Sequence, residues 1–151
     1  MLYKTIILVA LMSLQPLKDC PGMTEVRAAF QVLASEADLQ HLFDVLKQVN
    51  CEEKTPFLAV ATMRQAHFTS WPFKKMSYFK EGKTMLENYI KLHPDSIDAR
   101  YVRYLSQRCM PSFLNYHDNL EEDKSFILNH IKSAQLPEDY KSTILKTISE
   151  N

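Results

Sequence analysis

Apolar residues recur at intervals of three and four positions along most of the chain, which is the spacing of one face of an α-helix. Residues that start or stop helices interrupt the pattern. Ser35 and Asp38 form a capping-box pattern, Pro56 follows the helix-capping Thr55, and Pro94 ends a long periodic segment. Together they predict seven helices: 24–34, a second from Ser35, 55–69, 75–92, a fifth from Asp95 or Ser96 to about Cys109, a sixth from about Asp118, and a seventh from Pro137.

The predicted helices form two similar units. Residues 56–94 and 96–132 each contain a helix, a break and a second helix within just under forty residues. This predicts an all-α fold of antiparallel helix pairs, stacked as a short right-handed superhelix. Within it, "FKEGKTMLENYIKLHPDSIDARYVRYLSQ" resembles the junction of two tetratricopeptide-like repeats: Gly82 stands where helices approach closely, a proline follows the helix end, and Ala99 comes early in the next helix.

A second resemblance covers a longer part of the chain. The segments "TPFLAVATMRQAHFTSWPFKKMSYFKEGKTMLE" and "RYVRYLSQRCMPSFLNYHDNLEEDK" resemble a group of short exported bacterial helical proteins of unknown function. The resemblance implies a helical fold and export from the cytoplasm. It implies no activity, and it assigns no binding residues.

The first 22 residues have the plan of a signal peptide. Lys4 precedes a mostly apolar run from Thr5 to Leu14, and a polar stretch follows that Pro21 and Gly22 close. Ten such residues would span roughly 15 Å as a helix, about half of a bilayer's hydrocarbon core, so the run is too short for a stable membrane span. We therefore expect export to the periplasm or cell envelope and cleavage between residues 15 and 22, with the later cut preferred. Residues 23–151 would then form one helical domain.

The composition of the chain argues against several classes of function. Eighteen Lys and Arg balance eighteen Asp and Glu, so the chain has no net charge and no long-range field that would attract nucleic acid or an acidic membrane. The chain contains two glycines. Two glycines are too few for a glycine-rich phosphate loop, for the dinucleotide-binding fingerprint or for a hairpin-rich β fold. Nucleic-acid binding and these nucleotide-binding classes are therefore not expected.

The stretch that concentrates arginine, tyrosine, cysteine and histidine side chains is "RYVRYLSQRCMPSFLNYHD", residues 100–118. On a helical wheel, Tyr101 and Cys109 share an apolar face and are expected in the core. Arg100 and Arg103 lie on another face of this helix, and Tyr104 lies next to that face. An antiparallel partner helix would bring three acidic residues within reach of Arg103, giving ion pairs with Glu121, Glu122 and Asp123. The alternative is an anion-recognising groove built by Arg64, Arg100, Arg103 and Tyr104.

The histidines and cysteines lack the spacings of metal or catalytic motifs. We therefore expect no metal and no cofactor. His130 is interpreted as a core histidine, and His67 with Trp71 as a pair that fixes a turn by packing. Cys109 with His117 lacks the third group that would orient a nucleophile and its base, so catalysis by this pair is not expected.

The helix order also makes a prediction about disulfides. Cys51 and Cys109 would lie at opposite ends of two parallel helices, roughly 20 Å apart, whereas a disulfide needs Cα atoms within about 7 Å. These two cysteines are therefore expected to stay unpaired. Cys20, if it survives cleavage, could pair with Cys51, because the first two helices form a hairpin that returns the chain to the same level.

Two functions from different classes follow from the sequence. The first is a non-enzymatic exported module that binds an unidentified protein or peptide partner through a Tyr and Arg surface. The alternative is an exported enzyme or small-ligand sensor with a polar pocket between the third and fifth helices. The candidate binding residues are Arg64, His67, Arg100, Arg103, Tyr104 and His117.

Overall fold

The computed structural model describes residues 20–150, so residues 1–19 of the predicted signal peptide lie outside the described residues. The described residues fold into seven α-helices and two short 3-10 helices, without a β-strand. The predicted all-α fold is confirmed. The elements are α1 (Met23–Gln31), α2 (Glu36–Gln48), η1 (Glu52–Lys54), α3 (Thr55–Gln65), α4 (Pro72–Leu92), α5 (Ile97–Cys109), η2 (Ser112–Leu114), α6 (Leu120–His130) and α7 (Glu138–Ser149).

Side-chain caps set several helix boundaries where the sequence predicts them. Ser35 and Asp38 form a reciprocal capping box at the start of α2: the Ser35 Oγ accepts from the Asp38 amide at 3.1 Å, and the Asp38 carboxylate accepts from the Ser35 amide at 2.8 Å. Ser96 caps α5 through the Ala99 amide at 3.2 Å. Other boundaries differ from the prediction. α1 ends at Gln31 rather than at residue 34, and α3 ends at Gln65 rather than at residue 69. α4 begins at Pro72 rather than near residue 75, because proline is favoured in a helix's first turn.

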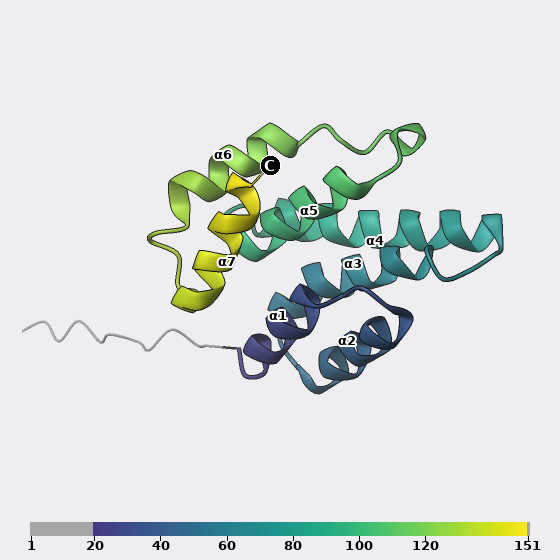
Figure 1. The fold of residues 1–151 in the computed structure, drawn as a ribbon, viewed down its shortest axis with the longest axis horizontal. Coiled ribbons are helices and arrows are strands. Elements are labelled where there is room, and N and C mark those ends of the chain that lie inside the picture. Colours follow the sequence, from purple (N-terminus) through teal and green to yellow (C-terminus); the bar gives the residue numbers. More distant parts are fainter. Residues whose placement is uncertain (1–19, 151) are drawn as a thin grey trace, which may run out of the picture.

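Consecutive helices pack as pairs: α1 with α2, α3 with α4, and α5 with α6 (Figure 1). The long helix α4 extends beyond the other helices at its N-terminal end (Figure 1). The final helix α7 crosses the end of the molecule near α1, and Tyr140 meets Tyr101 of α5 edge to face at 6.3 Å. Helix pairing is thus observed, whereas stacking of the pairs into a right-handed superhelix stays a prediction.

The centre of the molecule is α5, whose first eight residues, 97–104, are all buried. Neighbouring helices cover it on several sides, because α3, α4 and α6 all pack against it. Tyr101 lies in the core as predicted. Two other core predictions are wrong: Cys109 at the end of α5 is exposed, and so is His130, which stacks on Phe126 at 4.1 Å. Both are the last residues of their helices, and the helical periodicity from which their burial was predicted ends there.

Gly82 allows α3 and α4 to approach closely, as the sequence predicts for this position. A Cβ atom at Gly82 would overlap the Ala59 carbonyl oxygen and the Met63 side chain of α3. Since backbone cannot easily retreat, a side chain here would push the two helices apart. The hydrophobic core continues from this contact through the buried side chains of α1 and α2.

A disulfide joins Cys20 to Cys51, with Cα atoms 6.2 Å apart. It links the segment before α1 to the segment after α2, so it closes the α1–α2 hairpin covalently. The prediction that Cys51 stays unpaired with Cys109 and can meet Cys20 is confirmed. Cys109 has a free thiol. None of the described helices is both long and apolar enough to cross a membrane.

Candidate functional site

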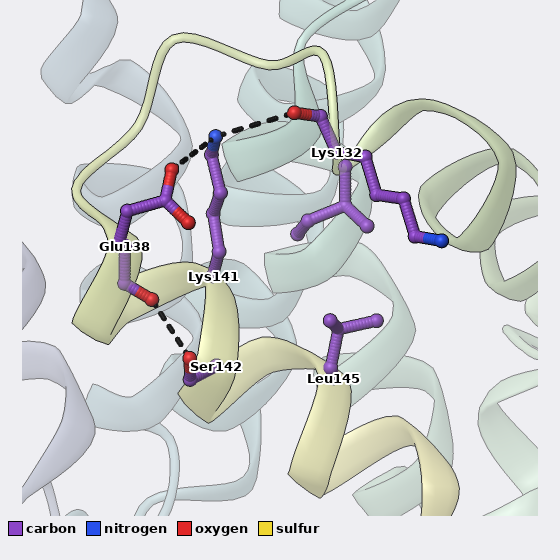
Figure 2. Close-up of a pocket in the computed structure, with 6 residues that line it drawn as sticks. Lys132, Glu138, Lys141, Ser142 and Leu145 are labelled. Atoms are coloured by element: carbon purple, nitrogen blue, oxygen red, sulfur yellow. Dashed lines mark hydrogen bonds and ion pairs between the residues drawn. The ribbon is translucent and has the colours of Figure 1, made fainter.

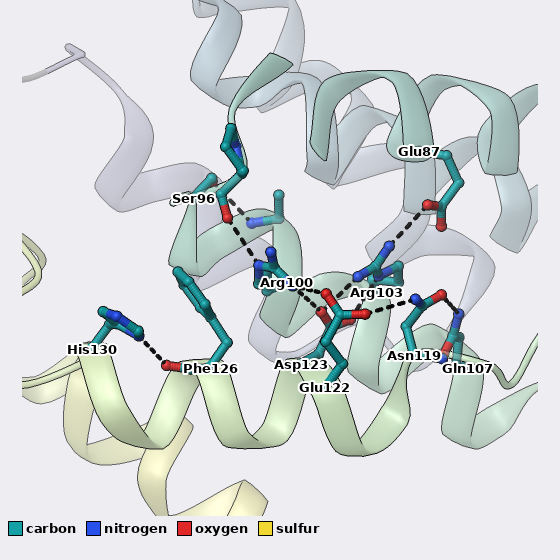
Figure 3. Close-up of polar contacts among 12 residues, drawn as sticks. Glu87, Ser96, Arg100, Arg103, Gln107, Asn119, Glu122, Asp123, Phe126 and His130 are labelled. Atoms are coloured by element: carbon teal, nitrogen blue, oxygen red, sulfur yellow. Dashed lines mark hydrogen bonds and ion pairs between the residues drawn. The ribbon is translucent and has the colours of Figure 1, made fainter. Parts of the chain in front are cut away.

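Two of the three predicted arginines, Arg100 and Arg103, lie in a group of charged side chains between α4, α5 and α6 (Figure 3). We call Glu87, Arg100, Arg103, Glu122 and Asp123 the arginine cluster. Arg103 makes two parallel bonds to Asp123: Nε donates to Oδ2 at 2.6 Å and Nη2 donates to Oδ1 at 2.7 Å. Its Nη1 donates to Glu87 at 2.9 Å. One guanidinium therefore ties α5 to both neighbouring helices.

Arg100, one turn earlier on α5, shares the same carboxylate. Its Nη1 donates to Asp123 at 3.0 Å and to Glu122 at 2.8 Å, and its Nε donates to the Pro94 carbonyl oxygen at 2.9 Å. The guanidinium also lies over the Phe126 ring, 4.2 Å from its centre. The Arg100 guanidinium therefore donates its hydrogen bonds to groups within the protein.

Burial makes these ion pairs different from surface salt bridges. The Asp123 side chain is fully buried and Arg103 almost so, while Glu122 remains 58% exposed. Burial disfavours the charged form of Arg103, but the hydrogen bonds to Asp123 outweigh it, and the pKa of Arg103 is raised. Hydrogen bonds from Arg100 and Asn119 lower the pKa of Glu122. The prediction that Arg103 pairs with acidic residues of the sixth helix is confirmed for Asp123.

Uncharged polar groups extend the cluster toward the α5–α6 connection. The Tyr116 hydroxyl donates to the second Glu87 oxygen at 2.6 Å. Burial, followed by this bond to Glu87, raises the pKa of Tyr116, so the phenol stays a donor at neutral pH. Gln107 exchanges bonds with Asn119 at 3.0 and 3.2 Å, and the His117 Nδ1 lies 2.8 Å from the Gln107 carbonyl oxygen. These contacts fix the residues that lead into α6.

The six candidate binding residues do not converge on one point. Arg100 and Arg103 lie in the arginine cluster, and His117 lies beside it. Tyr104 is buried under the Arg108 guanidinium, which stands 5.5 Å from its ring centre. Within residues 20–150, no hydrogen bond or ion pair joins the remaining two, Arg64 and His67, to these α5 residues.

The predicted packing of His67 against Trp71 is wrong. His67 instead meets Phe68 edge to face at 5.2 Å, and Trp71 is 69% exposed. The reason is local: α4 begins one residue after Trp71 and carries the indole away from the end of α3. The turn between α3 and α4 is therefore closed by Phe68, which packs against the core.

Two adjoining hollows flank the start of α7, and we call them together the α7 groove. The smaller one, of about 290 Å³, lies between α6 and α7 (Figure 2). The larger one, of about 570 Å³, lies between α1 and the α6–α7 connection. Glu138 and Lys141 line both, and Lys141 donates to Glu138 at 2.8 Å and to the Lys132 carbonyl oxygen at 3.4 Å (Figure 2).

The larger hollow combines apolar and charged walls. Met23, Leu136 and the disulfide residue Cys20 supply apolar surface, while Glu53 and Arg27 supply charge. Arg27 is already committed to the protein, because its guanidinium donates to Asp98 at 2.8 and 3.1 Å and stands 5.4 Å from the Tyr140 ring centre. Neither hollow is lined by Arg64, His67, Arg103, Tyr104 or His117.

Among the described residues, one group of three potential metal ligands lies close enough together to share an ion: Cys20, Cys51 and Glu53. Its two thiols are joined in the disulfide. A disulfide sulfur carries no thiolate charge, and the thiolate is the form of cysteine that binds metals. In its oxidised form this group therefore does not fit a metal.

Sequence reasoning did not identify Glu87 and Tyr116 as members of the polar network. Glu87 is separated from Arg103 by 16 positions, and it is reached only because α4 and α5 turn back on each other at Pro94. The available signal was the helix order: an antiparallel α4 places a carboxylate opposite Arg103. Nothing in the sequence indicated the α7 groove, because residues from α1, η1 and the α6–α7 connection meet only in the folded chain.

Comparisons with protein-family models, curated proteins and solved structures found no match for this chain. Its chemistry is therefore read from the described residues alone. The arginine cluster consists of donors and acceptors that satisfy one another inside the protein. The α7 groove, by contrast, offers polar and apolar groups at the surface.

Proposed function

We propose that the chain is a non-enzymatic, exported interaction module that binds a segment of a partner protein in the α7 groove. The observation that carries the proposal is that two adjoining hollows at the start of α7 share Glu138 and Lys141 in their linings. Two adjoining hollows suit an extended polypeptide, which can occupy both, better than they suit a compact metabolite. The partner is therefore expected to be a protein or peptide.

The groove lining has the mixture of groups that peptide recognition uses. Gln135 and Glu138 are exposed and offer hydrogen-bonding groups to a peptide backbone, and Ser142 is accessible beside them. Leu145 supplies apolar contact area in the smaller hollow and Leu136 in the larger one. Apolar floor and polar rim are the usual anatomy of a protein interface.

The arginine cluster supports this function indirectly. Its ion pairs fix α6 to α5, and the segment that follows α6, beginning with Ile131, forms one wall of the groove. A rigid wall lowers the entropic cost of binding, because less of the groove has to become ordered. In this proposal Arg100 and Arg103 position the groove and do not contact the partner.

The disulfide supports export. Structural disulfides persist in oxidising compartments such as the bacterial periplasm and are rare in the cytosol. The Cys20–Cys51 bond would be lost if the leader were cut after Gly22, so the proposal shifts the preferred cut to the N-terminal side of Cys20. The leader itself lies outside the described residues.

We predict that protein recovered from the cell envelope begins between residues 17 and 20 and retains Cys20. Intact mass and N-terminal sequencing measure this directly, and non-reducing peptide mapping reports the Cys20–Cys51 link in the same sample. An N-terminus at Met1 would contradict export with cleavage. An N-terminus at Met23, with Cys51 as a free thiol, would contradict the earlier cut.

The groove is tested by filling it. Gln135→Trp places an indole in the larger hollow, whereas Ser133→Trp adds the same side chain two residues away, at an exposed position outside the lining. With tagged full-length protein crosslinked in the intact envelope, we expect Gln135→Trp to reduce partner recovery at least tenfold and Ser133→Trp to leave it unchanged. Equal recovery with both variants would contradict binding in the groove.

A further inference from the structure

The first turns of α4 form an exposed end that no other described helix covers. Residues 70–77 are all exposed in succession, and the helix extends there beyond the rest of the molecule (Figure 1). We call residues 71–77 the α4 tip. It carries three large apolar side chains: Trp71 and Phe73 are 69% and 87% exposed, and Met76 is also exposed. Three such side chains within six residues exceed the scattered apolar exposure of an ordinary surface.

The α4 tip is also locally basic, although the whole chain has no net charge. Lys74, Lys75 and Lys80 are exposed, and no acidic residue occurs between position 69 and Glu81. The N-terminal end of the α4 dipole adds partial positive charge at the same place. The tip therefore combines an apolar surface with a positive potential that acts at short range.

We propose that the α4 tip binds an anionic phospholipid surface. Tryptophan and phenylalanine are favoured at the headgroup level of a bilayer, where their rings enter the acyl boundary. Lysines beside them reach the phosphates while their alkyl stems remain in apolar surroundings. The tip uses residues outside the α7 groove, so this proposal does not depend on the partner-binding function.

The shape of the tip favours a membrane over a folded protein partner. Neither of the two hollows of the α7 groove is lined by a residue of the tip. The tip instead projects and is exposed around its circumference, which suits insertion into a soft surface. The α5–α6 connection, which carries the exposed Phe113, lies toward the same end of the molecule and can add to the contact (Figure 1).

The test uses Trp71, the chain's single tryptophan, as its own reporter. Full-length protein is mixed with vesicles of phosphatidylglycerol or of phosphatidylcholine, and indole emission is recorded. We expect a shift to shorter wavelength with phosphatidylglycerol vesicles alone, reversed at about 1 M salt, where charges are screened beyond about 3 Å. Insertion of the apolar run at residues 5–14 alone would leave Trp71 in water and its emission unchanged.

Variants on the same helix separate the tip from general surface effects. Lys74→Gln with Lys75→Gln is expected to weaken binding to phosphatidylglycerol vesicles about 25-fold, from about fivefold per lysine near an anionic surface. Phe73→Ala weakens it as well. Lys91→Gln and Leu92→Ala, at the exposed C-terminal end of α4, serve as matched controls and leave it unchanged.

Three outcomes would overturn the proposal. An unchanged Trp71 emission with phosphatidylglycerol vesicles excludes insertion of the tip. A shift that appears on raising the protein concentration without lipid identifies a second copy of the chain as the occupant. A shift with polyglutamate but not with vesicles identifies an acidic polypeptide instead. Circular dichroism of each variant checks that helix content is unchanged, as expected for substitutions at exposed positions.

Discussion

Replacing Asp123 by alanine is expected to lower the free energy of unfolding by about 3–5 kcal/mol, because the change leaves buried arginine charge without its partner. Asp123 is fully buried and accepts bonds from both Arg103 and Arg100. For a domain of this size the loss corresponds to a fall in melting temperature of roughly 10–20 °C. Thermal and denaturant unfolding measure both quantities.

A double-mutant cycle with Arg103→Ala tests whether this loss comes from the pair. The two single variants should destabilise the protein by similar amounts, and the double variant should show a coupling energy of about 0.5–3 kcal/mol. Glu122→Ala is the control, because its 58% exposed carboxylate faces solvent and exposed pairs contribute at most about 1 kcal/mol. Purely additive effects of Asp123→Ala and Arg103→Ala would show that the two residues do not interact in solution.

Replacing Cys51 by serine should destabilise the protein by about 3.5 kcal/mol. The Cys20–Cys51 disulfide closes a loop of 31 residues, and a loop of that length restricts the unfolded chain by about this amount. The effect should appear in denaturant unfolding as a lower midpoint. Adding a reductant to the native protein should reproduce most of it.

Cys109→Ser is the matched control for the disulfide, since Cys109 is exposed and free. It should leave the unfolding midpoint unchanged within about 0.5 kcal/mol, as exposed substitutions usually do. If Cys51→Ser has no larger effect than Cys109→Ser, the disulfide does not form in solution. A crosslink between Cys51 and Cys109 would contradict the helix order itself.

Helix positions were predictable because the caps act locally. Ser35 with Asp38, Ser96 and Pro94 each interact within a few residues, so the sequence contains all the information that they need. The pairing of Cys20 with Cys51 was predictable for a related reason: a hairpin of two short helices brings its ends together whatever else it packs against. Both predictions needed only neighbouring elements.

The environment of α5 was less predictable. A helical wheel divides residues into one buried and one solvated face, and it placed Arg100 and Arg103 on the face that is usually solvated. In the folded chain both arginines are buried, because α4 and α6 cover that face too. The same wheel placed Cys109 in the core, although this last residue of α5 is exposed. Burial by distant elements carries no signal within one helix.

The candidate site was predicted in part. The opposite charges of Arg103 and Asp123 are visible in the sequence once an antiparallel helix pair is assumed, and their interaction is confirmed. Glu87 and Tyr116 required the position of α4 relative to α5, which depends on the whole core. The α7 groove required four separate segments of the chain.

The burial of α5 has a consequence for how the protein opens. Backbone amides exchange their hydrogens with solvent only when their hydrogen bonds break, and the slowest exchange marks the segments that open only on global unfolding. Residues 97–104 are buried without interruption, and from Arg100 onward their amides donate to helix carbonyls, so the amides of residues 100–104 should exchange last. Amides at 75–77 on the exposed tip of α4 should exchange many times faster, through fraying that leaves the Arg103–Asp123 bond intact. The tip can therefore change conformation at a surface while the centre of the fold stays closed.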